Sequence, residues 1–342
     1  MSSSVTRLFE YSAAAAVELP VQPAVAFPPS LHLAPAASTI TPLDLSAPLA
    51  LGFSPATSPN LLASFITLLP ASPPLRTDPT ATSQLFYVIR GSGSSTGASL
   101  TPDGAPLHWA EGDLFTVPGT SGPLLHAAET PASLYWVHDE PLLRYLGVAP
   151  SAPTFAPALY TRAALLARVE EIRHEPGAEH RNRMGVLLAH EATEGDTKTL
   201  TRVLWALLNT LPARSAQPPH RHNSVALDLA VSAAPGRVYT LMGPELGADG
   251  WVKDPIRMDW VAGAVFTTPP GWWCVWALGH LLRALSRGLT HHHLPAPPHN
   301  TRARRHSHHN DSDEVAWVLP VQDAGLFTRQ RVLDIRFSSA LA

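Results

Sequence analysis

The chain has 342 residues, enough for two domains, and 45% of them are hydrophobic, which excludes an intrinsically disordered protein. The formal net charge of -3 gives no indication of a nucleic-acid partner or of an acidic membrane surface, and no uninterrupted apolar run is long enough to span a bilayer. The single cysteine, Cys274, excludes an intrachain disulfide and favours a reducing, cytoplasmic location, although the Ser-rich first residues leave organelle targeting open.

The first 150 residues predict an arm followed by a β-domain. Residues 1–40 are rich in Ala and Pro, which predicts an arm lying on the surface. Short runs of β-branched and aromatic residues follow, separated by Gly turns, and predict strands within residues 83–93, 107–109, 113–118 and 134–137. This spacing is typical of an antiparallel barrel or sandwich, which we place at residues 41–150.

Residues 151–200 predict a linker that contains one helix, and residues 201–342 predict a second β-domain. The helix spans Ala163 to Arg173, where apolar residues recur at helical spacing, and Pro176-Gly177 ends it. Six strands are then expected within residues 203–211, 225–231, 238–242, 264–268, 315–319 and 332–337. The two β-domains repeat one pattern, since Glu111 to Pro118 matches Val261 to Pro269, which indicates an internal duplication.

His220 and His222 stand on alternate residues of a predicted strand, so both imidazoles point to the same face. A third imidazole is available further along the chain, at His306. Three neutral imidazoles make a site for Fe(II), Mn, Ni, Cu or Zn and leave coordination positions open for a substrate. The sequence therefore predicts a metal site in the second domain.

The spacing of these residues resembles the two metal-binding motifs of the cupin superfamily. The first motif ends in the His-x-His of residues 220–222, and the second begins at Gly263 and continues with Pro269-Pro270-Gly271. If residues 274–305 are set aside, His306 and Asn310 complete the second motif at the family's spacing. With the first-half segment of residues 83–93, the layout is most similar to bicupins of the gentisate 1,2-dioxygenase type.

The resemblance implies an all-β fold of two tandem cupin barrels, double-stranded β-helices of the jelly-roll type, joined by a short helical linker. It implies His220, His222 and His306 as metal ligands. His308 and Asn310 would lie around them, orienting ligands or moving a proton. The pocket would be walled by Trp272 and Trp273.

Many cupins add a Glu to the first motif, but Ala226 and Leu227 stand at that place here. A site of three His leaves room for a chelating substrate and dioxygen, which favours a mononuclear Fe(II) dioxygenase of a small aromatic hydroxy-acid, with Mn, Ni or Zn as alternative metals. Arg237 and Arg257 are candidates for binding its carboxylate. Two alternatives stay open: a non-catalytic cupin that binds a small ligand or serves as a scaffold, and a metal-dependent isomerase or lyase. A homo-oligomer is also left open.

The first domain departs from the family pattern. No His-x-His precedes its Gly turn, and after Pro118 only His126 follows. A single imidazole cannot hold a catalytic metal, so we expect this domain to be structural. For Arg90 and His108 a surface or core role is expected, and for His291-His292-His293 accidental clustering.

Residues 274–305 interrupt the second motif with five arginines and no Asp, Glu or Lys. The flanking sequences match the motif as though nothing had intervened. We therefore interpret the insertion as a translated retained intron or a gene-model error, and the alternative is a genuine lid over the metal site. In either case Trp273 and Arg305 are expected to lie close together in space.

Overall fold

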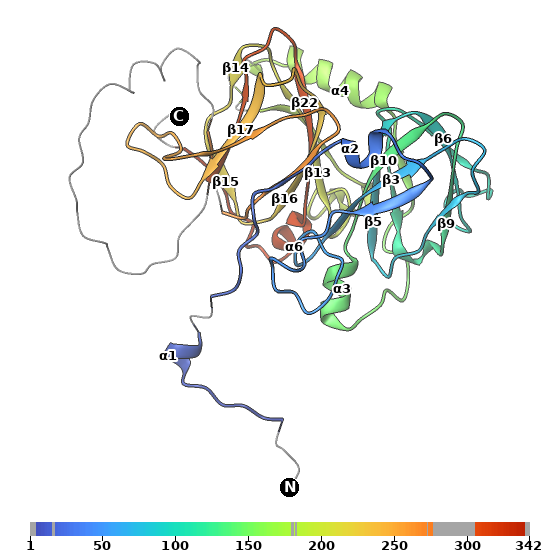
Figure 1. Cartoon of the computed structure of the whole chain (residues 1–342), viewed down its shortest axis with the longest axis horizontal. Helices are drawn as coiled ribbons and strands as arrows, with labels where there is room; N and C mark the ends of the chain where they lie inside the picture. The colour runs from blue at the N-terminus through green and yellow to red at the C-terminus, as the bar shows by residue number, and fades with distance from the viewer. Residues whose placement is uncertain are drawn as a thin grey trace.

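Two antiparallel β-barrels lie side by side in the computed structural model of the chain, as Figure 1 shows. The structure describes residues 5–15, 18–178, 181, 183–271, 273–275 and 305–338, and of residues 13, 273–275, 305 and 306 it describes the backbone alone. All named strand pairs among these residues are antiparallel, and most of them join strands that are not consecutive in the chain. The sequence-based prediction of two tandem β-barrels is therefore confirmed.

The first barrel consists of a six-stranded and a four-stranded sheet. In the larger sheet the order is β11-β8-β5-β10-β3-β2, and in the smaller one it is β4-β9-β6-β7. The strands of the larger sheet are β2 (Thr39–Pro42), β3 (Leu62–Leu68), β5 (Ser83–Arg90), β8 (Leu114–Pro118), β10 (Ala132–His138) and β11 (Ala158–Tyr160). Those of the smaller sheet are β4 (Leu75–Thr77), β6 (Ser92–Thr96), β7 (Leu107–Ala110) and β9 (Leu124–Ala128).

The second barrel consists of a six-stranded and a seven-stranded sheet. The first has the order β1-β19-β16-β22-β13-β12, and the second has the order β18-β17-β21-β15-β23, with β14 added to β21 and β20 to β17. The six strands are β1 (Ala26–Phe27), β12 (Met184–Leu188), β13 (Trp205–Leu211), β16 (Ala226–Ser232), β19 (Val265–Thr268) and β22 (Ala316–Gln322). The seven are β14 (Ser215–Ala216), β15 (His220–His222), β17 (Val238–Gly243), β18 (Ile256–Asp259), β20 (Trp273–Val275), β21 (Arg305–Asn310) and β23 (Ile335–Phe337).

Helices are few and lie outside the barrels. The longest, α4 (Arg162–His174), begins at Thr161, whose side chain accepts a hydrogen bond from the Ala164 amide, and it buries Leu165 and Val169. This is the helix that the sequence predicts at residues 163–173. The others are α1 (Tyr11–Ala14), α2 (Ser30–Leu33), α3 (Glu140–Leu146), α5 (Glu191–Glu194) and α6 (Ala324–Arg329), with a 3-10 turn at Gly119–Ser121.

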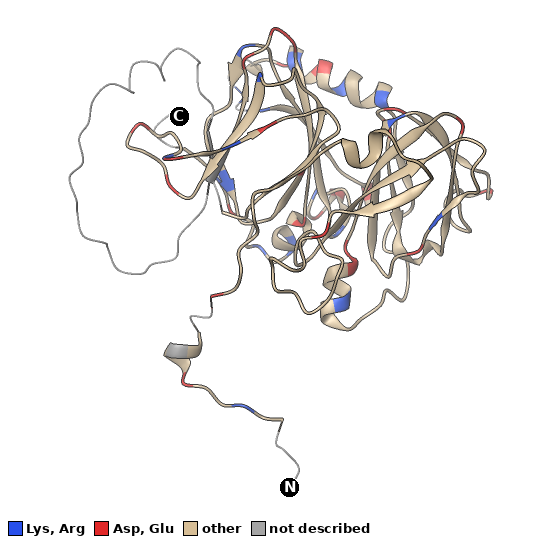
Figure 2. Cartoon of the chain, in the orientation of Figure 1, with Lys and Arg blue, Asp and Glu red and all other residues tan. Residues whose placement is uncertain are grey.

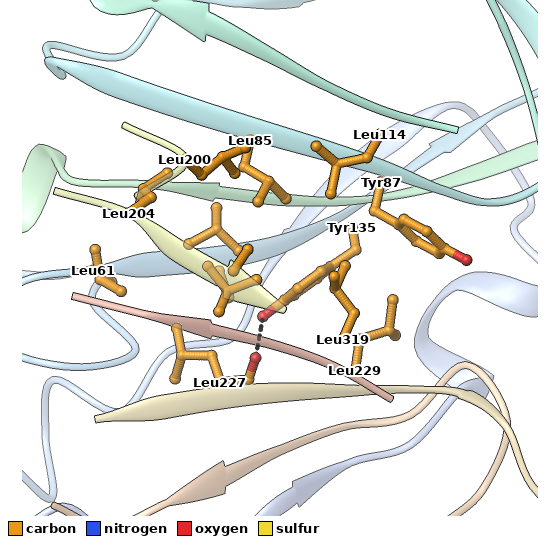
Figure 3. Packing of buried hydrophobic residues seen from close by; sticks show 14 of the residues in the cluster. Leu61, Leu85, Tyr87, Leu114, Tyr135, Leu200, Leu204, Leu227, Leu229 and Leu319 are labelled. Carbon is orange, nitrogen blue, oxygen red and sulfur yellow. Dashed lines mark hydrogen bonds between the residues drawn. The ribbon is translucent and has the colours of Figure 1, made fainter. Parts of the chain in front are cut away.

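The barrels pack against each other through their six-stranded sheets. Alternate residues of β5 and β10 face alternate residues of β16 and β22, as Figure 3 shows, and together they form one buried apolar cluster. Tyr135 lies at its centre, and its hydroxyl donates a hydrogen bond of 3.2 Å across the interface to the backbone oxygen of Leu227. The opposite faces of these strands line the barrel interiors, where two further apolar clusters lie.

The predicted duplication is visible in backbone geometry. Gly112 and Gly263 both adopt a positive φ, of 87° and 82°. The Gly112 amide donates to the Val88 oxygen at 2.9 Å, and the Gly263 amide donates to the Ala230 oxygen at 2.7 Å. A side chain at either position would be strained, so each copy of the repeated pattern has Gly at the same turn.

One proposed domain boundary falls within a strand, and two segments placed outside the second barrel pair with its strands. The boundary expected at residue 40 falls within β2, and β1 of the expected arm pairs with β19 of the second barrel. Likewise β12, within the expected linker, pairs with β13 of the second barrel along five residues. These short segments carry a weak strand pattern of their own, and pairing with a long neighbouring strand supplies their hydrogen bonds.

Charged residues are dispersed over the molecule. Figure 2 shows both signs on the exposed helices α3 and α4 and in the loops. None of the helices among the described residues combines the length and the apolar character that crossing a membrane requires.

Candidate metal centre

His220 and His222 occupy the two ends of β15, which lies between β21 and the edge strand β23 in the seven-stranded sheet of the second barrel. Both are buried, at 7% and 3% relative exposure, and their ring centroids are 5.6 Å apart. The backbone of His306 on β21 lies directly opposite His220 in the strand register. The fold thus brings the backbones of the three predicted ligands to one place, while the side chain of His306 is outside the described set.

Hydrogen bonding determines which nitrogen of His222 carries the proton. Its Nδ1 lies 2.8 Å from the backbone oxygen of Ser224, and a carbonyl oxygen can only accept, so Nδ1 is protonated. The Ser224 hydroxyl donates in turn to the Gln322 side-chain oxygen at 2.6 Å. Burial lowers the pKa of His222 to about 4, so the ring is neutral at pH 7 with its lone pair on Nε2. This is the form in which an imidazole binds a metal.

His308 shares this interior. Its ring centroid lies 6.4 Å from that of His220, and Trp260 packs edge-on against it at 5.3 Å. The His308 Nδ1 is 2.6 Å from the Thr240 hydroxyl, to which the Trp260 indole nitrogen donates at 2.8 Å. Burial lowers the pKa of His308, and these contacts hold its ring in one orientation beside the candidate ligands.

Arg183 is the residue of this site that the sequence did not reveal. It precedes β12, and its Nη2 lies 2.5 and 2.8 Å from the two ring nitrogens of His220. Its Nη1 donates to the side-chain oxygen of Gln217. Burial lowers the pKa of Arg183 to about 9, an effect that Asp228 opposes, so the guanidinium is charged at pH 7.

Asp228 adds a carboxyl group to the same interior. In β16 it alternates with Leu227 and Leu229, which face the first barrel, so its side chain points the other way. It accepts a hydrogen bond of 2.6 Å from the Thr268 hydroxyl. Burial raises the pKa of Asp228 to about 7, although Thr268 and Arg183 both act to lower it.

The residues fit a divalent metal in donor type and burial, and His222 also in protonation state. Two buried imidazoles on one strand face and a third histidine in register are the donor set that such ions take. Among the side chains that the structure describes, no three His, Cys, Asp or Glu meet at one point, and His306 lies outside that set. The Arg183 guanidinium at His220 carries a positive charge, so it must move away before His220 can bind a cation.

Asn310 is engaged in a turn. Its amide nitrogen donates to the backbone oxygens of Leu211, Pro212 and Glu314 at 2.7–3.1 Å. Its oxygen accepts from the backbone nitrogen and the hydroxyl of Ser312. These bonds favour a structural role at the end of β21 over the proton-transfer role expected from the family pattern.

Both ends of the insertion meet the same residue of β17. Trp273 of β20 and Arg305 of β21 are each paired with Gly243. Trp272 lies outside the described residues, as do the side chain of Trp273 and residues 276–304 with the three consecutive histidines. The expected role of the two tryptophans as a pocket wall therefore stays a prediction, and so does the interpretation of residues 274–305 as an insertion.

The two arginines suggested as carboxylate ligands lie on the outer surface of the second barrel. Arg237 donates to the backbone oxygen of Asp311. Arg257 pairs with Asp259 at 2.6 Å and covers the ring of Tyr239. Both cations are exposed, so neither belongs to the buried interior that holds the candidate ligands.

His126, on β9 of the first barrel, has two hydroxyl groups as its hydrogen-bond partners. His126 is fully buried, with its Nδ1 2.8 Å from the Ser95 hydroxyl and its Nε2 3.0 Å from the Thr77 hydroxyl. Phe86 lies beside it, stacked between Phe115 and Trp136. Burial lowers the pKa of His126 to about 4, and both ring nitrogens are occupied by hydroxyl groups. These contacts agree with the structural role that the sequence predicts for this barrel.

Arg90 and His108 also have local partners. Arg90 donates to the backbone oxygens of His32 and Leu33, at 3.2 and 2.7 Å, and so fastens α2 to the first barrel. His108 is exposed and lies 3.5 Å from Glu129. Neither residue lies at a candidate site.

Comparison with known proteins shows which solved structures share this fold. No protein-family model matches the sequence, and no curated protein matches it. Among solved structures, a mutant of salicylate 1,2-dioxygenase from Pseudoaminobacter salicylatoxidans is similar over 96% of this chain and 96% of its own, with a TM-score of 0.61 and 13% identity. The adduct of that dioxygenase with gentisate matches over 94% and 87%, with a TM-score of 0.63 and 12% identity. An oxalate decarboxylase matches over 90% and 78%, with a TM-score of 0.50 and 14% identity.

The likeness spans most of each chain. At such identities it shows the fold alone: two tandem antiparallel β-barrels arranged as in these neighbours, the architecture that the sequence predicts.

Proposed function

We propose that the second barrel binds a divalent metal, Fe(II) in preference to Mn, Ni or Zn, through His220, His222 and His306. On this proposal the protein is a dioxygenase-like enzyme that acts on a small aromatic hydroxy-acid. The observation that carries the proposal is the pairing of His222, fixed as the Nδ1–H tautomer, with His220 on the same strand face and His306 in register. The solved neighbours in which gentisate is bound support the substrate class.

The metal, when bound, would supply the redox chemistry with dioxygen that protein side chains lack. The chain's own residues would bind and orient the acid. Arg183 is a buried, charged guanidinium beside His220, and such a fork binds a carboxylate through two parallel hydrogen bonds. A substrate carboxylate would therefore draw Arg183 away from His220, which links substrate binding to the availability of that ligand.

His308 and Asp228 would act around the substrate. Thr240 and Trp260 hold the His308 ring, and burial keeps the ring neutral. A neutral imidazole can accept a hydrogen bond from a phenolic hydroxyl or donate one to a phenolic oxygen. Asp228 supports the charge of Arg183. The buried apolar residues of the barrel, among them Phe266 and Val318, exclude water from this space.

A second candidate is a cupin without a metal that binds a small acid. The contact of Arg183 with His220 favours it, because a guanidinium at that distance repels a dication. In that case Arg183 and Gln217 would hold the ligand, and no oxygen would be consumed.

Metal analysis of purified wild-type protein and of two variants separates these candidates. We expect about one Fe or Mn per chain in the wild type and more than about tenfold less in His220→Ala, because removing even a residue that orients a ligand commonly costs 10- to 100-fold in affinity. His309→Ala is the matched control, since His309 lies next to His308 on β21, points to the opposite face of the strand and is buried there against the ring of Tyr239. Metal loss from both variants, or from His126→Ala in the first barrel, would contradict the assignment.

Oxygen uptake with gentisate or salicylate tests the reaction. Uptake that depends on added Fe(II) and disappears in His220→Ala supports the dioxygenase. Binding of gentisate by metal-free protein without oxygen uptake supports the second candidate.

A further inference from the structure

A cavity lies where the two barrels and the N-terminal segment meet. It has a volume of about 400 Å³, within the range of small-molecule sites. Apolar residues form most of its wall: Pro20, Val21, Leu49, Pro59, Val225, Pro269, Pro270 and Phe327. The polar lining residues are Gln22, Asn60, Asn223 and Asp323. Among the described lining residues there is no Lys, Arg or His, so the cavity offers no positive charge.

Gln22 is buried at 5% relative exposure and lines this cavity. Its Nε2 donates to the backbone oxygen of Thr57 at 2.9 Å. Because a carbonyl oxygen only accepts, the amide cannot be turned the other way. The Gln22 Oε1 has no hydrogen-bond partner among the residues that the structure describes. An unsatisfied buried acceptor costs free energy, which a ligand that donates a hydrogen bond would recover.

Asp323 supplies negative charge to the same cavity. It is buried at 4% exposure, and its carboxylate accepts from the Asn60 amide at 2.6 Å and from the Val225 backbone nitrogen at 3.2 Å. Both donors are neutral. Burial raises the pKa of Asp323 to about 6, which reflects a carboxylate that lacks a compensating cation. Since Asn60 turns its nitrogen to Asp323, its own oxygen is a further acceptor in the lining.

We propose that this cavity binds a small organic molecule with a primary ammonium group on an apolar body. The ammonium supplies three N–H donors and a positive charge, which match the Gln22 oxygen and the Asp323 carboxylate. The apolar part packs against the prolines and Phe327. An organic acid, the substrate class proposed for the second barrel, does not fit here, because its carboxylate would meet Asp323. This site is therefore separate from the candidate metal centre.

The experiment is calorimetric titration of the full chain with n-butylammonium chloride at pH 7.5. We expect a Kd of about 1 mM or tighter, and no binding of sodium butyrate, which has a similar body and the opposite charge. Tetramethylammonium, which has charge but no N–H donor, should bind at least about tenfold more weakly. Absence of n-butylammonium binding, or equal binding of any of these compounds, would overturn the proposal.

Two variants locate the binding. Asp323→Asn removes the charge and is expected to weaken n-butylammonium binding at least about tenfold, while the exposed Asp313→Asn should leave it unchanged. If Asp323→Asn does not fold, Gln22→Met removes the unpartnered oxygen at similar volume, and it should weaken binding several-fold. In amide NMR spectra the Gln22 side-chain signals, identified by their loss in Gln22→Met, should shift on titration. Unchanged affinity in the folded variants or unmoved Gln22 signals would place the binding elsewhere and refute the inference.

Discussion

Replacing Asp228 by asparagine tests the electrostatics of the second barrel interior. Burial raises the pKa of Asp228 from 3.8 to about 7. A carboxyl group whose pKa is higher in the folded state contributes stability that is present below pH 3.8 and is lost as the pH rises through about 7. The wild type should therefore lose stability from this group as the pH increases. The asparagine side chain of the variant cannot ionise, and its oxygen still accepts the hydrogen bond from Thr268.

The magnitude follows from the shift. Each pH unit between the two pKa values changes the free energy of unfolding by about 1.4 kcal/mol, and the change becomes smaller near pH 7. From about pH 5 to about pH 7 the sum is roughly 2 kcal/mol. The free energy of unfolding of Asp228→Asn, measured relative to the wild type, should thus be about 2 kcal/mol higher at pH 7 than at pH 5. This change does not depend on the relative stability of the variant at pH 5.

Urea unfolding of both proteins, followed by tryptophan fluorescence at pH 5, 6 and 7, gives the difference in unfolding free energy at each pH. Comparing the variant with the wild type cancels the other titrating groups, including Asp323 and the buried histidines. Asp313→Asn, at an exposed carboxylate, is the control and should show the same difference at each pH. A difference for Asp228→Asn that does not change with pH would refute the placement of a carboxyl group whose pKa is raised by burial in this interior.

Three further outcomes are expected. Tyr135→Phe removes the hydroxyl that bonds Leu227 across the barrel interface and should lower the free energy of unfolding by about 1 kcal/mol in urea melts; no change would mean that water replaces this bond. Phe86→Ala, which empties the stack in the first barrel, should cost about 3–5 kcal/mol, whereas Leu146→Ala at a 57% exposed site should change stability by less than about 0.5 kcal/mol. Deleting residues 274–305 should raise the melting temperature and the metal affinity together, and loss of folding or of a measured activity would identify the segment as a lid.

The sequence predicts what depends on short-range patterns. Alternating apolar residues predict the strands, and the Gly-to-Pro pattern predicts the two copies of the turn at Gly112 and Gly263. The His220-x-His222 spacing places two imidazoles on one strand face. These features follow from the two-residue period of a strand and from the conformational freedom of Gly, which neighbouring residues alone determine.

The two-residue period of a strand also predicts the face on which Asp228 lies. Asp228 is the one charged residue in an apolar strand and falls on the face opposite Leu227 and Leu229. The family's motif places its carboxylate at the positions of Ala226 and Leu227, so the motif does not indicate Asp228. The period of the strand does indicate the face on which the Asp228 carboxyl group lies.

Only the tertiary structure shows the contacts between distant segments. Arg183 reaches His220 because β12 joins the edge of the second barrel, and no local pattern indicates that pairing. The Gln22 and Asp323 cavity likewise needs an N-terminal segment and a loop of the second barrel, from opposite ends of the chain, to lie together. Such contacts depend on how sheets pack and on which edges remain unpaired, so their free energy is set by the whole fold rather than by the residues beside them.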